Sequence, residues 1–108
     1  MFLYKKEIIN RTKELLKNAP NLKEKSQKNK LTLLEHYEIN SLIRALNALQ
    51  LEDQKLIAYK YFENKTKKQI AEIMFISVKI VGRKIDEIIL KIGHIIYGIE
   101  KEVWNLIE

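Results

Sequence analysis

The stretch from residue 66 to residue 92 constrains this chain most, because it predicts two short helices that meet at a tight turn. Thr66 suits the N-cap of the first helix, and Gln69 stands where it completes a capping box. Ser77 suits the N-cap of the second helix. The first helix is expected to bury Ile70, Ala71, Ile73 and Met74. The second has one apolar stripe at i, i+4, i+7 and i+11, formed by Val81, Ile85, Ile88 and Ile92.

The second helix also has a short basic face. At 3.6 residues per turn, Lys79, Arg83 and Asp86 lie about opposite the stripe, with Gly82 beside them. Such a helix fits the major groove of DNA, where Arg reads guanine edges and Lys neutralises phosphate. A solvated helix face without a ligand has the same composition, so the spacing of the two helices favours DNA binding more than the charge does.

The expected roles of the basic residues differ along the motif. Lys67 and Lys68, at the start of the first helix, are expected to hold phosphates together with nearby backbone amides. Lys79, Gly82 and Arg83 are expected to approach base edges, with Lys84 at the groove margin. The candidate DNA-binding set is Lys67, Lys68, Ser77, Val78, Lys79, Gly82, Arg83 and Lys84.

Three runs of residues carry a resemblance to a known family: residues 61–66 (YFENKT), residues 69–73 (QIAEI), and Ile76-Ser77 followed by Val81 and Ile85. Over residues 40–93 the chain resembles region 4 of sigma-70-type factors. Among free-standing proteins it is similar to small phage late transcriptional regulators of the ArpU and RinA type. The resemblance implies a helix-turn-helix that binds double-stranded DNA, on two supporting helices whose outer surface can meet RNA polymerase.

The chain departs from that family at two positions. Phe75 stands where the family usually has Gly, and the turn residue there often needs a positive φ, which a bulky side chain resists. Gln69 stands where the family usually has Glu.

The length of 108 residues predicts a single domain with one modest core, without room for a promoter-melting region. Apolar residues make up 46% of the chain and mostly recur at helical spacing, which predicts an all-α fold with a long C-terminal helix. The chain has no cysteine, and its first ten residues resemble neither a secretory signal nor a membrane span. We expect a cytoplasmic protein.

No enzymatic or metal chemistry is indicated. The two histidines, His36 and His94, have no second ligand at metal spacing and are expected at the surface. No phosphate-binding glycine loop and no paired acids are present, and Ser77 has no activating base beside it. We therefore expect neither an enzyme nor a bound cofactor or metal.

The net charge of +6 is distributed unevenly. Residues 1–30 hold nine Lys or Arg against three Glu, and residues 66–85 hold five basic residues against one acid. Residues 86–108 hold five acids against two Lys. Basic clustering on a small helical domain favours an anionic partner and a contact that weakens steeply with salt.

Three segments are expected: residues 1–30, 31–93 and 94–108. In the first, a helix over residues 2–18 should end at Pro20, which removes a backbone donor. Residues 21–30 are then a basic linker or a solvated helical extension. Thr32 and Glu35 form a second capping box, which opens a helix to about Leu49. Its expected inner stripe is Ile39, Leu42, Ile43, Leu46 and Leu49. The next helix starts at Leu51 and should bury Leu56, Ile57, Tyr61 and Phe62.

The last helix needs a second neighbour, because Ile88, Ile89 and Leu90 point in three directions. That neighbour is the N-terminal helix folded back or the same helix of a second subunit. We favour a homodimer, which presents two reading helices to two half-sites. Gly93 and Gly98 would permit a close approach or a bend. The candidate dimerisation set is Ile88, Leu90, Ile92, Ile95, Ile96 and Ile99.

Two other functions remain open from the sequence. One is a recognition subunit resembling the small subunit of a phage packaging terminase, which would share the motif but form a larger ring. The other is a helical adaptor that binds RNA polymerase without touching DNA, an interpretation that Phe75 and Asp86 favour.

Overall fold

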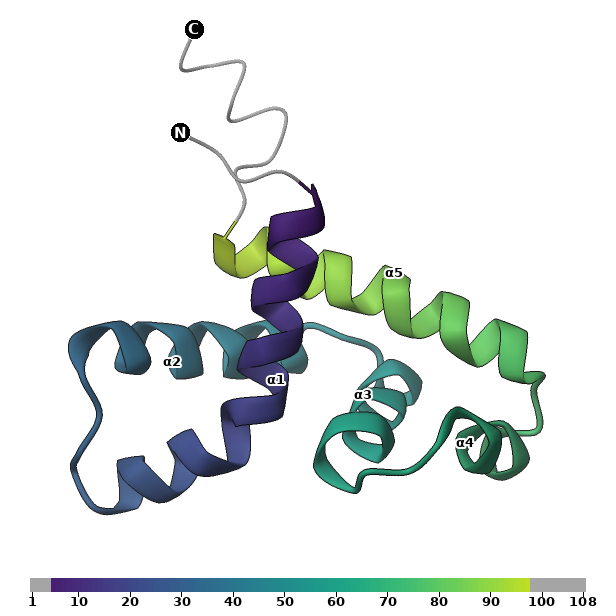
Figure 1. The fold of residues 1–108 in the computed structure, drawn as a ribbon, viewed down its shortest axis with the longest axis horizontal. Helices are drawn as coiled ribbons and strands as arrows, with labels where there is room; N and C mark the ends of the chain where they lie inside the picture. The colour runs from purple at the N-terminus through teal and green to yellow at the C-terminus, as the bar shows by residue number, and fades with distance from the viewer. Residues whose placement is uncertain (1–4, 98–108) are drawn as a thin grey trace, which may run out of the picture.

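The computed structural model describes residues 5–97, and within this range it is all helical (Figure 1). Five α-helices and one π-helical turn follow each other, with these bounds: α1 Lys5–Gln27, α2 Leu33–Asn47, α3 Leu51–Ile57, η1 Ala58–Phe62, α4 Lys67–Met74 and α5 Val78–Tyr97. The expectations for residues 2–4, for Gly98 and for Ile99 fall outside the described residues. The all-α prediction is confirmed for the part that is described.

Helix α1 is longer than predicted, because it continues through Pro20 to Gln27. Its buried residues keep helical spacing on both sides of the proline: Ile8, Thr12, Leu15, Leu16, Ala19 and Leu22. Pro20 itself is exposed, and Figure 1 shows α1 bending in its second half, as a missing backbone donor leads one to expect. The predicted helix end at Pro20 was wrong, because the burial of Ala19 and Leu22 outweighs the cost of the proline. Of the two expectations for residues 21–30, the helical extension holds as far as Gln27.

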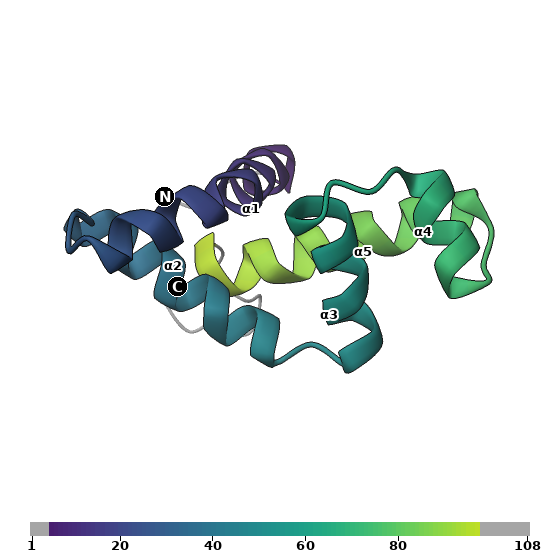
Figure 2. The ribbon, with the colours of Figure 1, turned by 90° about the horizontal axis from the view of Figure 1, so that it is seen from below.

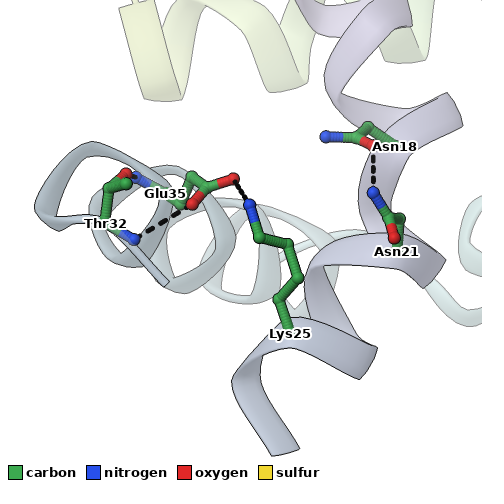
Figure 3. A network of polar contacts seen from close by, with 5 residues as sticks. All are labelled: Asn18, Asn21, Lys25, Thr32 and Glu35. Carbon is green, nitrogen blue, oxygen red and sulfur yellow. Dashed lines mark hydrogen bonds and ion pairs between the residues drawn. The ribbon is translucent and has the colours of Figure 1, made fainter. Parts of the chain in front are cut away.

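A polar network joins the end of α1 to the start of α2 (Figure 3). The hydroxyl of Thr32 accepts the backbone N–H of Glu35 at 3.2 Å, and the backbone N–H of Thr32 donates to the Glu35 carboxylate at 3.0 Å. The predicted capping box is thus confirmed. Lys25 of α1 donates to the other Glu35 oxygen at 2.7 Å. This hydrogen bond is the main reason that the pKa of Glu35 is lowered, and the Thr32 N–H adds to it.

Helix α5 is the central element, and α1 crosses it at a steep angle (Figure 1). A Cβ added at Gly93 would lie 2.4 Å from Ile8 Cγ2 and 2.5 Å from Thr12 Oγ1, so glycine is needed where the two helices touch. Seven residues of α5 are buried, namely Val81, Ile85, Ile88, Ile89, Ile92, Gly93 and Ile96. One core cluster includes buried residues from all five α-helices.

The predictions for α2 and α3 hold only in part. Leu42, Leu49, Leu56 and Ile57 are buried, and Ile39 and Leu46 pack partly buried against the core. Ile43 is 49% exposed and Phe62 is 38% exposed, so their assignment to the core was wrong. The π-helical turn explains Phe62, since the Glu63 N–H donates to the Ala58 carbonyl and the wider turn rotates the side chains that follow.

Different helices form the two ends of the molecule (Figure 2). The short helix α4 and the start of α5 form one end. The second half of α1 and the helix α2 form the other. In the described range, no helix is both long and apolar enough to cross a lipid bilayer.

Candidate nucleic-acid interface

The start of α4 is held by the predicted capping box. The Thr66 hydroxyl accepts the backbone N–H of Gln69 at 3.1 Å, and the Gln69 side chain accepts the Thr66 N–H at 2.9 Å. Ile70 and Ala71 are buried, and Met74 packs partly buried against the core. Ile73 is 41% exposed, so its predicted place in the core was wrong. With eight residues, α4 has room for only a narrow buried face.

Phe75 forms the turn after α4 in a left-handed conformation, with φ 57° and ψ 42°. The Ile76 N–H donates to the Ala71 carbonyl at 3.2 Å, the bond that closes a helix in a Schellman motif. Glycine usually occupies this position, and a residue with a Cβ costs roughly 1–2 kcal/mol there. The Phe75 side chain is 93% exposed, so it avoids a steric clash by pointing into solvent. The turn therefore forms with a bulky residue at its left-handed position.

The start of α5 is capped as predicted, since the Ser77 hydroxyl accepts the backbone N–H of Ile80 at 3.1 Å. Val78, the first residue of the helix, is 47% exposed. The stripe of Val81, Ile85, Ile88 and Ile92 is buried, as the spacing predicts. Cap and stripe together fix the rotation of α5, and with it the direction of every residue on the opposite face.

That opposite face carries the basic residues. Lys79, Arg83 and Asp86 are exposed, and Lys84 is half-buried. Arg83 Nε lies 4.0 Å from the Glu87 carboxylate, and both side chains are 69% exposed, so this ion pair is weak and leaves the guanidinium free to move. Lys67, Lys68, Lys79 and Lys84 form no ion pair with any residue of the described range.

Lys67 reaches from α4 to α5, a contact that the sequence did not predict. A Cβ built on Gly82 would lie 3.5 Å from Lys67 Nζ. Lys67, which is predicted to hold a phosphate, and Gly82, which is predicted to approach base edges, therefore lie next to each other on one surface. Residues 66–85 carry the basic excess of this end of the molecule, and we call the surface that they form the α4–α5 corner.

The pKa of a tyrosine in the π-helical turn is also affected by a residue of α5. Burial raises the pKa of Tyr61 above its ordinary value, and the negative charge of Asp86 raises it further. Tyr61 and Tyr59 pack partly buried against the core, and for Tyr61 this agrees with the predicted core position.

The candidate dimerisation set divides into four groups. Ile88, Ile92 and Ile96 are buried within the single chain, and Leu90 is half-buried. Ile95 is 46% exposed, and Ile99 lies outside the described residues. Helix α1 supplies the second neighbour that α5 was expected to need, because Ile8 and Thr12 press on Gly93. The buried members are therefore not on the surface of this fold.

His36 and His94 are not buried, in agreement with their expected place at the surface. In the described residues, no three Asp, Glu or His side chains gather where they could hold a metal ion. Comparisons with protein-family models, with curated protein sequences and with solved structures found no match for this chain.

Proposed function

We propose that the chain is a sequence-specific DNA-binding regulator that reads double-stranded DNA through a helix-turn-helix formed by α4 and α5. The observation that carries the proposal is the α4–α5 corner. Two capped helices meet at a left-handed turn, and their buried faces leave Lys67, Lys79 and Arg83 on the surface around Gly82. The resemblance to sigma region 4 and to phage late regulators supports the same function.

In this proposal α5 enters the major groove with its first turns. Arg83 reads a base edge, because its weak pair with Glu87 is readily given up for a bidentate contact with guanine. Lys67 and Lys68 hold phosphates at the start of α4, where backbone N–H groups point outward. Gln69 completes the cap there without adding a negative charge that would repel phosphate.

The test is selection from genomic DNA fragments by the purified full chain over a range of salt concentrations. Arg83→Ala should lower the preference for the selected site, at a cost of about 1–3 kcal/mol. Lys67→Ala should weaken binding to selected and to scrambled DNA by similar factors. It should also reduce the slope of log affinity against log salt concentration by about 1. Lys23→Ala is the matched control, because it removes one exposed positive charge from the second half of α1, at the other end of the molecule (Figure 2).

If Arg83→Ala and Lys67→Ala weaken binding equally on every DNA sequence, the proposal that Arg83 reads bases and Lys67 holds phosphates is contradicted. The absence of any salt-dependent binding would contradict the proposed function itself.

A second candidate is a helical adaptor that contacts RNA polymerase and not DNA. The exposed Phe75 favours it, since this side chain stands in solvent and two apolar neighbours in the sequence, Ile73 and Val78, are 41% and 47% exposed. Capture of purified RNA polymerase by the wild type and not by Phe75→Gly, without any DNA affinity, would support the adaptor.

A further inference from the structure

Two glycines of α5 mark the places where other helices cover it. Gly82 and Gly93 are eleven residues apart, which is about three full turns, so both lie on the same flank of α5. A Cβ on Gly82 would meet the side chain of Lys67 at the start of α4, and a Cβ on Gly93 would meet Ile8 and Thr12 of α1. The start of α4 and the first half of α1 therefore lie along one flank of α5.

The π-helical turn η1 lies between these two helices and contacts both of them. It is also close to Asp86, which stands between the two glycines in the sequence and acts on the pKa of Tyr61 in η1. Figure 2 shows α1 and the segment that leads from η1 into α4 on the same side of α5, opposite α2. We call this surface the α4–η1–α1 row. It follows α5 for about 16 Å, at about 1.5 Å per residue.

Each part of the row carries a lysine. Lys67 starts α4, Lys60 belongs to η1, and Lys13 belongs to α1. Arg11 of α1 stands over the ring of Tyr97, whose hydroxyl is bonded to α2. Lys13, two residues further along α1, points about 200° around the helix from Arg11 and so away from α2. Lys13 and Lys60 are half-buried, and such lysines bury their stems and keep their ammonium groups in water.

The row has more cations than acids. Neither Lys13 nor Lys60 forms an ion pair with any residue between 5 and 97. Glu63 lies 3.9 Å from Lys65, and Glu14 of α1 is matched by Lys17, also at 3.9 Å. Asp86 is the other acid of this flank. The lysines of the row and its border with η1, which outnumber the two acids Glu63 and Asp86, are Lys13, Lys60, Lys65 and Lys67.

We propose that the α4–η1–α1 row is a second DNA surface, on which Lys60 and Lys13 hold phosphates outside the sequence that α5 reads. The duplex continues from the α4–α5 corner along η1 to the first half of α1. At about 3.4 Å per base pair, the row of about 16 Å runs beside roughly five base pairs. Phosphate contacts of this kind position a protein on DNA without reading sequence. The inference rests on the proposed function, because it needs DNA at the corner.

The test compares two duplexes that carry the site obtained from the DNA selection described above. The short duplex ends at the site, and the long one adds about ten base pairs of scrambled sequence on each side, about twice the length of the row. Fluorescence anisotropy measures the affinity of the full chain for each duplex over a salt series. The wild type should bind the long duplex several-fold more tightly. Its log affinity should also fall more steeply with log salt concentration there, because more phosphates are neutralised.

Lys13→Gln and Lys60→Gln remove the charges and keep most of each stem. On the long duplex, each should reduce the slope of log affinity against log salt concentration by about 1. Neither should change binding to the short duplex, and Lys13→Arg and Lys60→Arg should behave as the wild type. Lys91→Gln is the matched control, because Lys91 is exposed and stands nine residues after Gly82, about half a turn away from the row. It should leave the difference between the duplexes unchanged.

Equal affinity of the wild type for the two duplexes would overturn the inference and leave the proposed function standing. This comparison needs no substitution, so it decides the matter even where a variant loses its helical circular dichroism signal. Losses that are as large on the short duplex, or that Lys91→Gln reproduces, would also overturn the inference. If neither duplex is bound, the proposed function fails and the inference fails with it.

Discussion

The two halves of α5 place their glycines in different surroundings. In the first half, Gly82 faces the flexible end of Lys67, whose amine lies 3.5 Å from the point that a Cβ would occupy. In the second half, Gly93 faces Ile8 and Thr12, and a Cβ there would lie 2.4 Å and 2.5 Å from their side chains. The first half faces a charged, mobile neighbour at the proposed DNA surface. The second is fixed by stiff β-branched side chains.

The two capping boxes, one near each half of α5, also differ from each other. Thr32 and Glu35 start α2, and their acid is tied to Lys25. Thr66 and Gln69 start α4, and their neutral amide has no such partner within the described range. The two boxes share the same hydrogen-bond pattern and differ in charge, which suggests that one serves the fold and the other also leaves room for an anion.

The largest effect is expected from Gly93→Ala. The added methyl would overlap Ile8 and Thr12, and overpacking of this kind costs about 1–3 kcal/mol of unfolding free energy. Urea denaturation measures it. Gly82→Ala is the control, because its methyl meets only Lys67 and alanine is the better helix former, so it should stabilise by up to about 1 kcal/mol. Equal destabilisation by both changes would remove the contrast between the two halves.

The next effect concerns the caps. Thr32→Ala and Thr66→Ala should each lower the unfolding free energy by about 1 kcal/mol, because each leaves one helix-start N–H without its acceptor. Only Thr66→Ala should also weaken DNA binding, since it loosens the start of α4. Thermal melts and DNA titrations of the same samples compare the two. Matching losses of DNA affinity would show that the ends are coupled.

Exchanging the N3 residues, Glu35 for Gln in one box and Gln69 for Glu in the other, should change the pH dependence of stability at one end and DNA binding at the other. The pKa of Glu35 is lower in the folded than in the unfolded chain, so its stabilising contribution is complete above pH 4.5 and is lost as the pH falls through the folded-state value. Glu35→Gln should flatten the acid side of the stability curve. Gln69→Glu should keep the cap and weaken DNA binding a few-fold at low salt, less at high salt.

The Gln69→Glu prediction is contradicted if the variant binds DNA as tightly as the wild type at every salt concentration. That result would mean that the start of α4 lies away from the phosphates.

The smallest effect is expected from Glu87→Gln. The pair with Arg83 spans 4.0 Å between exposed side chains, and such pairs contribute less than about 1 kcal/mol. Unfolding free energy should hardly change, and DNA affinity should rise slightly because one negative charge leaves the proposed interface. A clear loss of stability would mean that Arg83 is held more firmly than its exposure indicates.

Local signals in the sequence predicted the local features of the structure. The Thr32 and Thr66 boxes, the Ser77 cap and the stripe on α5 depend on residues within a few positions of each other, and all were found. Features set by distant neighbours were predicted less well. The helix passes Pro20 because Ala19 and Leu22 find a core. For the second neighbour of α5 the sequence left two alternatives open, and the structure places Ile8 of α1 against Gly93.

The candidate site follows the same division. The spacing placed the basic face of α5 opposite its stripe, and the structure exposes Lys79 and Arg83 there. The approach of Lys67 to Gly82 depends on how α4 and α5 cross, so no pattern in the sequence could predict it. The exposure of Phe75 belongs to the same class, because the exposure of a side chain is a property of the folded chain.

The short buried face of α4 has a consequence for backbone motion. Only Ile70 and Ala71 are buried in this helix, against six residues in α1 and seven in α5. Segments with few buried contacts open at a lower free energy than the rest of a protein. The amides of α4 should therefore exchange with solvent deuterium earlier than those of α5, and a bound ligand at this end would be registered first as slower exchange in α4.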